Sequence, residues 1–434
     1  MAELLSRMFR KRTSRREFIK RLSTGTALFS IVPSYVLAGR GHKAPSDTVT
    51  RAVIGTGGMG MGHIQPNRDD GPIETVAVCD VDSNHLAEGL KKAGRGCEGY
   101  SDFRKVLERR DVDTVHVVTP PHWHALISIA AMQAGKDVLS EKPLTRFIQE
   151  GRVECAAVER YGRILLVNSY GRGDFIRLRR LIASGLLGSP LTVRAAKRFG
   201  CNFKVAEWSG RTNLVPESVP SALDYDMWLG PAPYKPYHPH RVHQSFRCYW
   251  DYDGGGLADM AQHWIDPIQY VLGKDGTGPD TVETYAPWPA HPDAVLMWGR
   301  AWLRYADGTT IIFDSEEYGD QEKGEHAYIE GPKGRVLERD GTKTDPPGLF
   351  EQSESYPVPP RDKSFDEAVK TRDNTNTAKP NVWEAHRSIT LAHLVNISIR
   401  VGRKIRWDPV KEEIIGDEAA QRFVDQPMRA PWHL

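Results

Sequence analysis

Six consecutive residues, Gly55-Thr56-Gly57-Gly58-Met59-Gly60, have the G-x-G-x-x-G spacing of a phosphate-binding turn. They follow a run of β-forming residues, 50–54, and a second such run, 74–79, ends at Asp80. In a strand–turn–helix unit these glycines permit a tight turn, close approach of backbone N–H groups to a pyrophosphate, and packing of the helix on the strand. An acidic side chain after the second strand accepts hydrogen bonds from ribose hydroxyls and repels a 2′-phosphate. The pattern predicts a dinucleotide site that takes NAD rather than NADP.

A carboxylate and an imidazole four residues apart, Asp259 and His263, would share one face of a helix. A histidine near a carboxylate can have its tautomer fixed and its pKa tuned, which suits proton transfer. Lys142 follows a predicted strand, 137–140, and a lysine there can stabilise developing alkoxide charge. Spacing alone favours a helix-surface ion pair and a solvated lysine over a catalytic set.

The segments around these residues alternate between β and α patterns, as expected of a parallel sheet. A helix is predicted at 61–68 after the glycine turn, another at 101–109, a buried strand at 113–118 and a helix at 125–134. In an open α/β sheet, ligands bind beyond the carboxyl ends of the strands. The loops there should therefore line the cofactor cleft, which makes candidates of Thr119, Pro120, Trp123, His124, Glu141 and Lys142.

The pattern changes after Asn168, where the chain should leave the nucleotide domain. A helix is predicted at 175–183, a strand at 191–196 and a long helix at 382–401, with later β-runs at 301–305, 309–313, 326–330 and 335–337. Residues 208–253 form a long aromatic and proline-rich excursion, and residues 341–360 are predicted to be a surface loop.

Several of these motifs together resemble the Gfo/Idh/MocA family of NAD(P)-dependent sugar and inositol oxidoreductases. They are the glycine turn with Asp80, Thr119-Pro120-Pro121 with His124, and Glu141-Lys142-Pro143. Arg172 with residues 181–188 resembles the family's step into a second domain, and residues 254–266 resemble its glycine-rich Asp-x-x-x-His signature. Ala261 stands where the family usually has glycine. The resemblance extends from about residue 49 to the end of the chain.

The resemblance implies an α/β fold with two domains. Residues 48–168 would form an NAD-binding Rossmann domain with a doubly wound parallel sheet, and residues 169–434 an α+β domain with a mostly antiparallel open sheet. It implies His263 as general acid/base, Asp259 as its orienting partner or second acid, and Lys142 as the polarising cation. It also implies NAD as cofactor, a carbohydrate substrate and a homo-oligomer, either dimer or tetramer.

The excursion is rich in aromatic rings interspersed with polar groups, which is the composition of a carbohydrate cleft. Core packing should account for more than half of these rings. The candidate substrate residues are Arg172, Tyr237, His240, Arg241, His243 and Trp250. The length of the excursion favours an extended or glycosidic substrate. The imidazole clusters at 121–124 and 238–243 could bind zinc with Asp251 or Asp253, but proline and loop geometry favour no metal.

Three functions fit these observations. The first is an oxidoreductase that passes hydride from a secondary alcohol of a sugar or glycoside to tightly bound NAD. The second is a glycosidase or lyase in which bound NAD oxidises the sugar transiently, permits elimination and is restored. The third is a sugar- and NAD-binding protein without catalysis, which the presence of Lys142, Asp259 and His263 disfavours.

Charge and cysteine content exclude other classes. The chain has a formal net charge of +2, but residues 1–21 hold eight basic and two acidic side chains, so the remainder carries −4. A mildly acidic body does not suit nucleic-acid binding. The five cysteines form no C-x-x-C pair, which argues against a structural zinc site of that spacing.

The N-terminus resembles an export signal. Arg15-Arg16 lie before Phe18, an apolar stretch runs to Val36, and Val36-Leu37-Ala38 resembles a cleavage site. We expect residues 1–38 to be a Tat-type signal peptide and residues 39–47 a linker. Polar residues and Pro33 interrupt the apolar stretch, so no stable membrane insertion is expected after removal of the signal. The predicted location is periplasmic or otherwise extracytoplasmic.

Overall fold

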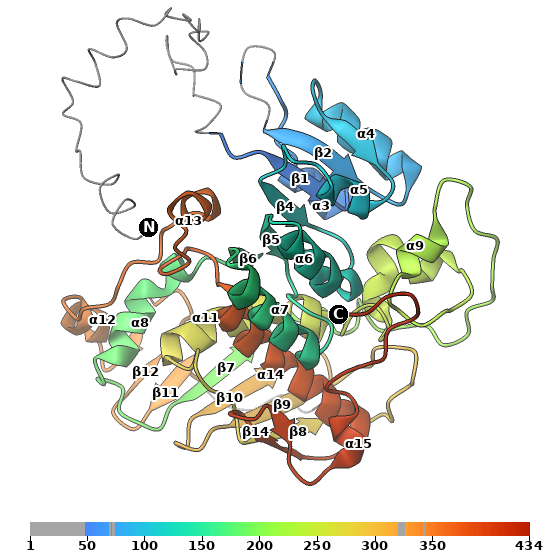
Figure 1. Cartoon of the computed structure of the whole chain (residues 1–434). Coiled ribbons are helices and arrows are strands. Elements are labelled where there is room, and N and C mark those ends of the chain that lie inside the picture. Colours follow the sequence, from blue (N-terminus) through green and yellow to red (C-terminus); the bar gives the residue numbers. More distant parts are fainter. Residues whose placement is uncertain (1–47, 69–70, 72–73, 320–325, 342) are drawn as a thin grey trace, which may run out of the picture. The chain divides into compact units, whose positions relative to one another are not determined.

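The computed structural model describes residues 48–434 except 69–70, 72–73, 320–325 and 342 (Figure 1). The chain divides into two units, residues 1–48 and residues 49–434, and both sheets belong to the second unit. The expected signal peptide and linker lie outside the described residues. Among the described helices, none combines the length and the hydropathy that a bilayer crossing requires.

Six parallel strands form the first sheet, in the order β3-β2-β1-β4-β5-β6. Strands β2 and β4 are buried throughout, as expected of parallel strands covered on both faces. The strand order reverses between β1 and β4, the point at which doubly wound sheets bind dinucleotides. The predicted Rossmann fold is therefore confirmed. The strands are β1 (Arg51–Ile54), β2 (Thr75–Cys79), β3 (Glu98–Tyr100), β4 (Thr114–Val117), β5 (Asp137–Glu141) and β6 (Leu165–Asn168).

Helices follow most of these strands. Asp82 caps α4 and Asp102 caps α5 by accepting hydrogen bonds from first-turn N–H groups, so local sequence fixes both helix starts. The helices are α3 (Gly58–His63), α4 (Ser83–Ala93), α5 (Phe103–Leu107), α6 (His124–Gln133) and α7 (Ile148–Tyr161).

The second sheet is mostly antiparallel, as expected. It has nine strands in the order β13-β12-β11-β7-β10-β9-β8-β14-β15, and β7 with β10 is its parallel pair. The strands are β7 (Thr192–Ala196), β8 (Thr281–Tyr285), β9 (Arg300–Arg304), β10 (Thr310–Asp314), β11 (Ile329–Gly331), β12 (Gly334–Val336), β13 (Thr344–Asp345), β14 (Ile405–Asp408) and β15 (Glu413–Ile414).

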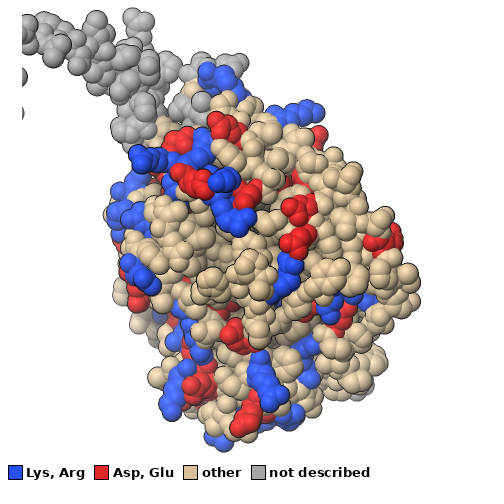
Figure 2. Space-filling model, turned by 45° about the vertical axis from the view of Figure 1, so that its right-hand side comes forward, with Lys and Arg blue, Asp and Glu red and all other residues tan. Residues whose placement is uncertain are grey.

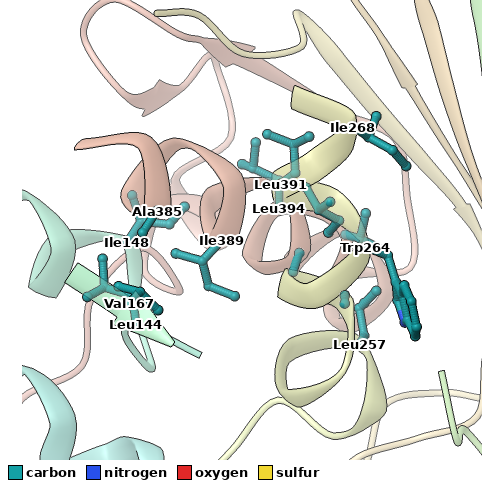
Figure 3. Close-up of a cluster of buried hydrophobic side chains, with 14 of the residues drawn as sticks. Leu144, Ile148, Val167, Leu257, Trp264, Ile268, Ala385, Ile389, Leu391 and Leu394 are labelled. Atoms are coloured by element: carbon teal, nitrogen blue, oxygen red, sulfur yellow. The ribbon is translucent and has the colours of Figure 1, made fainter. Parts of the chain in front are cut away.

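Helix α14 (Val382–Val401) has the bounds that the sequence predicts and joins the two sheets. It contacts α7 and β6 on one side and α10 (Gly256–Asp259), α11 (Ala261–Leu272) and β8 on the other. Figure 3 shows the core that results, where side chains of α14 such as Ile389 and Leu394 lie between Val167 of β6 and Ile268 of α11. One continuous apolar core therefore holds α10 and α11, which carry Asp259 and His263, against the nucleotide-binding sheet.

Two local predictions were wrong. The helix predicted at 61–68 ends at His63, because Ile64 adopts an extended backbone conformation. The loop predicted at 341–360 contains β13 and a short helix, α12 (Leu349–Ser353). Leu349 and Phe350 are buried where α12 packs on α8 (Ile176–Ala183), so two apolar residues order a segment that is otherwise polar.

The remaining helices lie in the excursion and the C-terminal region. They are α9 (Tyr225–Leu229), α13 (Phe365–Thr371) and α15 (Glu418–Gln421). The excursion also has two 3₁₀ turns, Pro239–Arg241 and His243–Cys248, and its aromatic side chains form a separate apolar cluster. Figure 2 shows acidic and basic side chains interspersed on one face of the molecule.

Candidate active site

A cavity of about 530 Å³ lies at the carboxyl ends of strands β1, β2, β4 and β5. Residues from both the Rossmann domain and the excursion line it. From the predicted cofactor residues, the lining contains Gly55, Gly57, Gly58, Met59, Asp80, Thr119, Pro120, Trp123, Glu141 and Lys142. From the excursion it contains Met227, Trp228, His243, Gln244, Phe246 and Arg247.

The glycine turn has the shape that a dinucleotide requires. A Cβ atom at Gly60 would lie 1.8 Å from the carbonyl oxygen of Gly55, so only glycine permits this packing of α3 on the turn. At Gly57 and Gly58, by contrast, an added Cβ atom would have room. A Cβ at Gly57 would meet nothing closer than 3.7 Å, and one at Gly58 would meet nothing within 4 Å. The backbone therefore borders empty space where a pyrophosphate would lie, and the residues fit NAD.

Asp80 is held by the glycine turn. Its Oδ2 accepts hydrogen bonds from the backbone N of Thr56 at 2.7 Å and the Oγ1 of Thr56 at 3.2 Å. Its Oδ1 accepts one from the backbone N of Asp82 at 2.9 Å. The carboxylate is thus fixed in the cavity wall, where it can receive ribose hydroxyls. Thr56 itself is buried and acts on the cavity through Asp80.

His124 connects the two predicted cofactor loops. One ring nitrogen lies 2.7 Å from the carbonyl oxygen of Thr119, and the other lies 2.7 Å from that of Pro143. Burial lowers the pKa of His124, although both carbonyl contacts favour the charged form. His124 and Gly60 do not appear in the cavity lining of the described chain. They position the loops that do.

At one end of the cavity, Asp259 bridges two cations. Lys142 Nζ donates to Asp259 Oδ1 at 2.9 Å, and Arg247 Nε donates to Asp259 Oδ2 at 3.1 Å. Lys142 and Asp259 are buried. Burial alone would raise the pKa of Asp259, but Lys142 and Arg247 hold it below its ordinary value. The site is therefore a Lys–Asp–Arg cluster with an ionised aspartate, and all three side chains line the cavity.

His263 lies near this cluster but is not among the described residues that line the cavity, and no hydrogen bond joins it to Asp259 among the described contacts. The continuous helix expected from Asp259 to His263 is interrupted, since α10 ends at Asp259 and α11 begins at Ala261. The backbone N of His263 donates to the carbonyl of Met260, a tighter turn than an α-helix has. The imidazole stacks on Tyr170, with ring centroids 4.3 Å apart. Burial and Lys142 lower the pKa of His263 to about 4.

Of the six predicted substrate residues, only His243 appears in the cavity lining of the described chain. The other five lie outside this lining and make other contacts in the described chain. Arg172 is fully buried and paired with Asp266, Asp275 and Glu384. Arg241 pairs with Asp293 at 2.6 Å, and the His240 ring contacts the hydroxyl of Tyr249 at 2.7 Å.

The two aromatic substrate candidates pack inside the protein. Tyr237 is buried against Tyr225 in the apolar cluster of the excursion. Trp250 is buried with the guanidinium carbons of Arg146 and Arg400 at 3.9 and 4.0 Å from its ring centroid. Both rings are therefore core residues, which is the role predicted for more than half of the aromatic side chains in the excursion.

The excursion lines part of the cavity and is anchored to the Rossmann domain in two places. Residues 81–83 and 222–224 exchange backbone hydrogen bonds, from Ser83 N to Ala222 O and from Asp224 N to Val81 O, both 2.9 Å. On the opposite loop, Trp123 Nε1 donates to the carbonyl of Trp228 at 3.1 Å. The aromatic content of the excursion was visible in the sequence, but not which rings reach the cleft.

A metal-type group lies beside Asp80. Ligand atoms of Asp82, His85 and His243 all lie within 4.8 Å of one another. One oxygen of Asp82 already caps α4. Within the described residues, this group shares only His243 with the two imidazole clusters considered from sequence.

Models of the Gfo/Idh/MocA oxidoreductase family match both domains. Residues 49–169 match its NAD-binding Rossmann fold, and residues 173–434 match its C-terminal alpha/beta domain. Both the predicted family and the NAD-binding domain are thus confirmed.

Curated relatives match over part of the chain. Inositol 2-dehydrogenase of Salmonella typhimurium (strain LT2) is 28% identical over 152 residues, which are 34% of this chain and 45% of the relative. Inositol 2-dehydrogenase 4 of Saccharopolyspora erythraea is 33% identical over 181 residues, 41% of this chain and 52% of the relative. A glycosyl hydrolase family 109 protein of Shewanella pealeana is 29% identical over 177 residues, 38% of this chain and 39% of the relative. The chain spans about half the length of these relatives or less.

Solved structures share the whole fold. The WlbA dehydrogenase from Bordetella pertussis, in complex with NADH and UDP-GlcNAcA, has a TM-score of 0.55 and 19% identity, over 83% of this chain and 99% of that one. GenD2 from gentamicin A biosynthesis, in complex with NAD, has a TM-score of 0.52 and 17% identity, over 85% and 98%. These similarities show the fold, a parallel Rossmann-like sheet together with a mostly antiparallel second sheet.

Proposed function

Because the chain belongs to the Gfo/Idh/MocA oxidoreductase family, we propose that it oxidises a secondary alcohol of a sugar or glycoside with NAD as hydride acceptor. The observation that carries this proposal is the Lys142–Asp259–Arg247 cluster at the end of the dinucleotide cleft. A buried ammonium held by a carboxylate is suited to a substrate oxygen that gains negative charge.

The chain's own residues supply proton transfer and orientation. Lys142 donates a hydrogen bond to the reacting hydroxyl oxygen, while Asp259 holds the ammonium in place. His263 is neutral at physiological pH because its pKa is lowered to about 4, so its imidazole accepts the hydroxyl proton. NAD, when bound, accepts the hydride from the carbinol carbon. Arg247 binds a neighbouring polar group of the sugar. Trp228 and Phe246, which line the cavity from the excursion, offer apolar faces to the sugar ring.

The position of the excursion supports retention of NAD between turnovers. The dinucleotide would lie between the glycine turn and the excursion, which is anchored to the Rossmann domain at residues 81–83 and at Trp123. Exchange of the cofactor then requires these anchors to open. We propose that NAD stays bound, that the protein is exported by the Tat pathway with its cofactor, and that the physiological reaction returns NAD to its starting redox state.

A second candidate is a redox-neutral glycosidase or lyase. The Shewanella pealeana relative, named as a glycosyl hydrolase, favours it. In that reaction the same residues would permit transient oxidation of the sugar, elimination of the aglycone and return of the hydride. A protein that binds sugar and NAD without catalysis is the weakest candidate, because it would not require a buried lysine paired across two domains.

The deciding experiment begins with protein purified without added NAD, followed by gel filtration. We expect bound nucleotide to remain after this step. A panel of sugars and glycosides is then tested by NADH absorbance and product analysis. Net NADH formation supports the oxidoreductase, while release of aglycone without net NADH supports the glycosidase. Lys142→Met is the matched control, since it keeps the length of the side chain and removes the charge. Equal conversion by wild type and this variant would refute both catalytic proposals.

A further inference from the structure

Three titratable side chains form a chain of contacts beneath the glycine turn. Glu141 Oε1 lies 2.9 Å from His63 Nε2, and His63 Nδ1 lies 3.2 Å from His116 Nδ1. Glu141 ends β5, His63 ends α3 and His116 lies within β4, so three separate elements meet here. Asn168 Nδ2 also donates to Glu141 Oε1, at 2.6 Å. The proposed proton transfer uses none of these four groups.

Burial holds His116 in its neutral form. His116 is 4% exposed, and burial lowers its pKa well below the ordinary value, with Arg51 and His63 acting in the same direction. A neutral His116 that donates its Nδ1–H to His63 leaves the Nε2–H of His63 to donate to Glu141. His116 Nε2 is then bare, in agreement with its burial without a hydrogen-bond partner.

Glu141 stays ionised in this environment. Burial alone would raise its pKa, but the hydrogen bonds from His63 and Asn168, together with Lys142, hold the pKa below its ordinary value. Asp259 differs, because two cations are hydrogen-bonded to it. The side chains hydrogen-bonded to Glu141 are instead the imidazole of His63 and the amide of Asn168.

The position of Glu141 decides which part of the dinucleotide its charge affects. Asp80 follows β2 and marks the adenosine side of the crevice, whereas Glu141 lines the cavity at the end of β5. A dinucleotide spans the crevice at which the strand order reverses, so its nicotinamide half lies on the β4–β5 side. The oxidised nicotinamide ring carries a positive charge that the reduced ring lacks. A nearby anion therefore stabilises the oxidised form.

We propose that His63 and His116 are positioning residues that hold Glu141 as an anion beside the nicotinamide, so that the cleft binds NAD⁺ in preference to NADH. The inference rests on the use of this cleft by NAD in the proposed function, but not on the identity of the sugar. A cleft biased toward NAD⁺ suits an enzyme whose retained cofactor must begin each cycle oxidised.

The test is the midpoint potential of the bound NAD⁺/NADH couple in the holoenzyme, titrated against redox dyes. We expect Glu141→Gln to reduce the preference for NAD⁺ about tenfold, which raises the potential by about 30 mV. His63→Leu should raise it in the same direction, because Glu141 loses its donor. His63→Gln keeps an N–H donor and should restore most of the wild-type value. If a variant purifies without nucleotide, the ratio of its dissociation constants for added NAD⁺ and NADH gives the same quantity.

Asp82→Asn is the matched control, since it removes a carboxylate from the same cavity at the adenosine side. It should change the affinities for NAD⁺ and NADH by the same factor and leave the potential unchanged. Wild-type potentials in both Glu141→Gln and His63→Leu would overturn the proposal, as would an equal shift in Asp82→Asn. Inactivity toward every sugar would refute the proposed function without altering these potentials, so the two failures are distinguishable.

Discussion

Lys142 Nζ lies 2.9 Å from Asp259 Oδ1, although 117 positions of sequence separate the two residues. Lys142 follows the fifth strand of the Rossmann sheet, and Asp259 ends α10 in the second domain. The contact therefore joins the domains at the end of the cofactor cleft. Because both side chains are buried, the pair forms only when α10 and α11 pack against the nucleotide-binding domain. Catalytic geometry thus depends on the interdomain core.

Removal of the lysine should abolish most turnover. We expect Lys142→Ala to lower kcat by a factor of about 10² or more, because the substrate oxygen loses its charged donor. Arg247 still pairs with Asp259 in this variant, so the fold should persist. Steady-state kinetics on the substrate identified in the panel would measure the effect, with the exposed Lys91→Ala as control. Turnover near the wild-type value would remove Lys142 from the mechanism.

The pH profile should report His263. Its pKa is lowered to about 4, so the neutral imidazole that accepts a proton persists well below pH 6.5. We expect kcat/KM for sugar oxidation to stay level as the pH falls toward 5 and to decline only as His263 gains a proton near pH 4. His263→Ala should lower turnover by about 10² or more, with little change in NAD affinity. Near-normal turnover of this variant across the pH range would direct attention to His243, which lines the cavity.

Cofactor choice should depend on Asp80. We expect wild-type protein to bind NAD much more tightly than NADP, since the fixed carboxylate repels a 2′-phosphate. Asp80→Ser should weaken NAD binding and relax the discrimination. The loss for NAD should include a contribution from the glycine turn, because Asp80 also accepts the backbone N–H of Thr56. Calorimetric titration with both cofactors tests this, and equal dissociation constants in the wild type would contradict it.

The sequence predicted features that depend on residues close together along the chain, and it did not predict contacts between distant residues. The glycine turn and Asp80 lie within a single strand–helix–strand unit, so spacing alone indicated their roles. The ion pairs of Arg172 could not be predicted, because its three carboxylate partners lie 94, 103 and 212 positions away and nothing local indicates that they surround it. Arg247 belongs to the excursion, and its bond to Asp259 depends on how this region with little regular structure folds back on the cleft.

Replacement of Arg172 should lower the stability of the fold. Its guanidinium is fully buried and donates to Asp266 at 2.6 Å and to Asp275 at 2.9 Å. We expect Arg172→Leu to destabilise the fold by about 3–5 kcal/mol, because removal of one partner leaves buried carboxylates uncompensated. Denaturant unfolding measures the loss. Arg172→Leu combined with Asp266→Leu should recover part of it, and a single variant as stable as wild type would restore a functional interpretation of Arg172.

Glu154 of α7 should make stability depend on pH with a sign opposite to that of an ordinary ion-paired carboxylate. The side chain is completely buried, and burial with the neighbouring Glu150 raises its pKa well above the ordinary value. As the pH rises above about 4.5, the unfolded chain releases this proton while the folded protein keeps it. The wild type therefore loses about 1.4 kcal/mol of this contribution per pH unit until the folded-state group also ionises.

Glu154→Gln removes the titration and keeps the shape, so its free energy of unfolding relative to wild type should increase as the pH rises from 4.5 toward 7. Urea unfolding at several pH values measures the difference, and Glu159→Gln, at an exposed position on the same helix, is the matched control. A difference that stays constant with pH would show that Glu154 ionises alike in the folded and unfolded states. A difference that decreases with rising pH would show that the folded protein holds Glu154 as an anion, contrary to its burial.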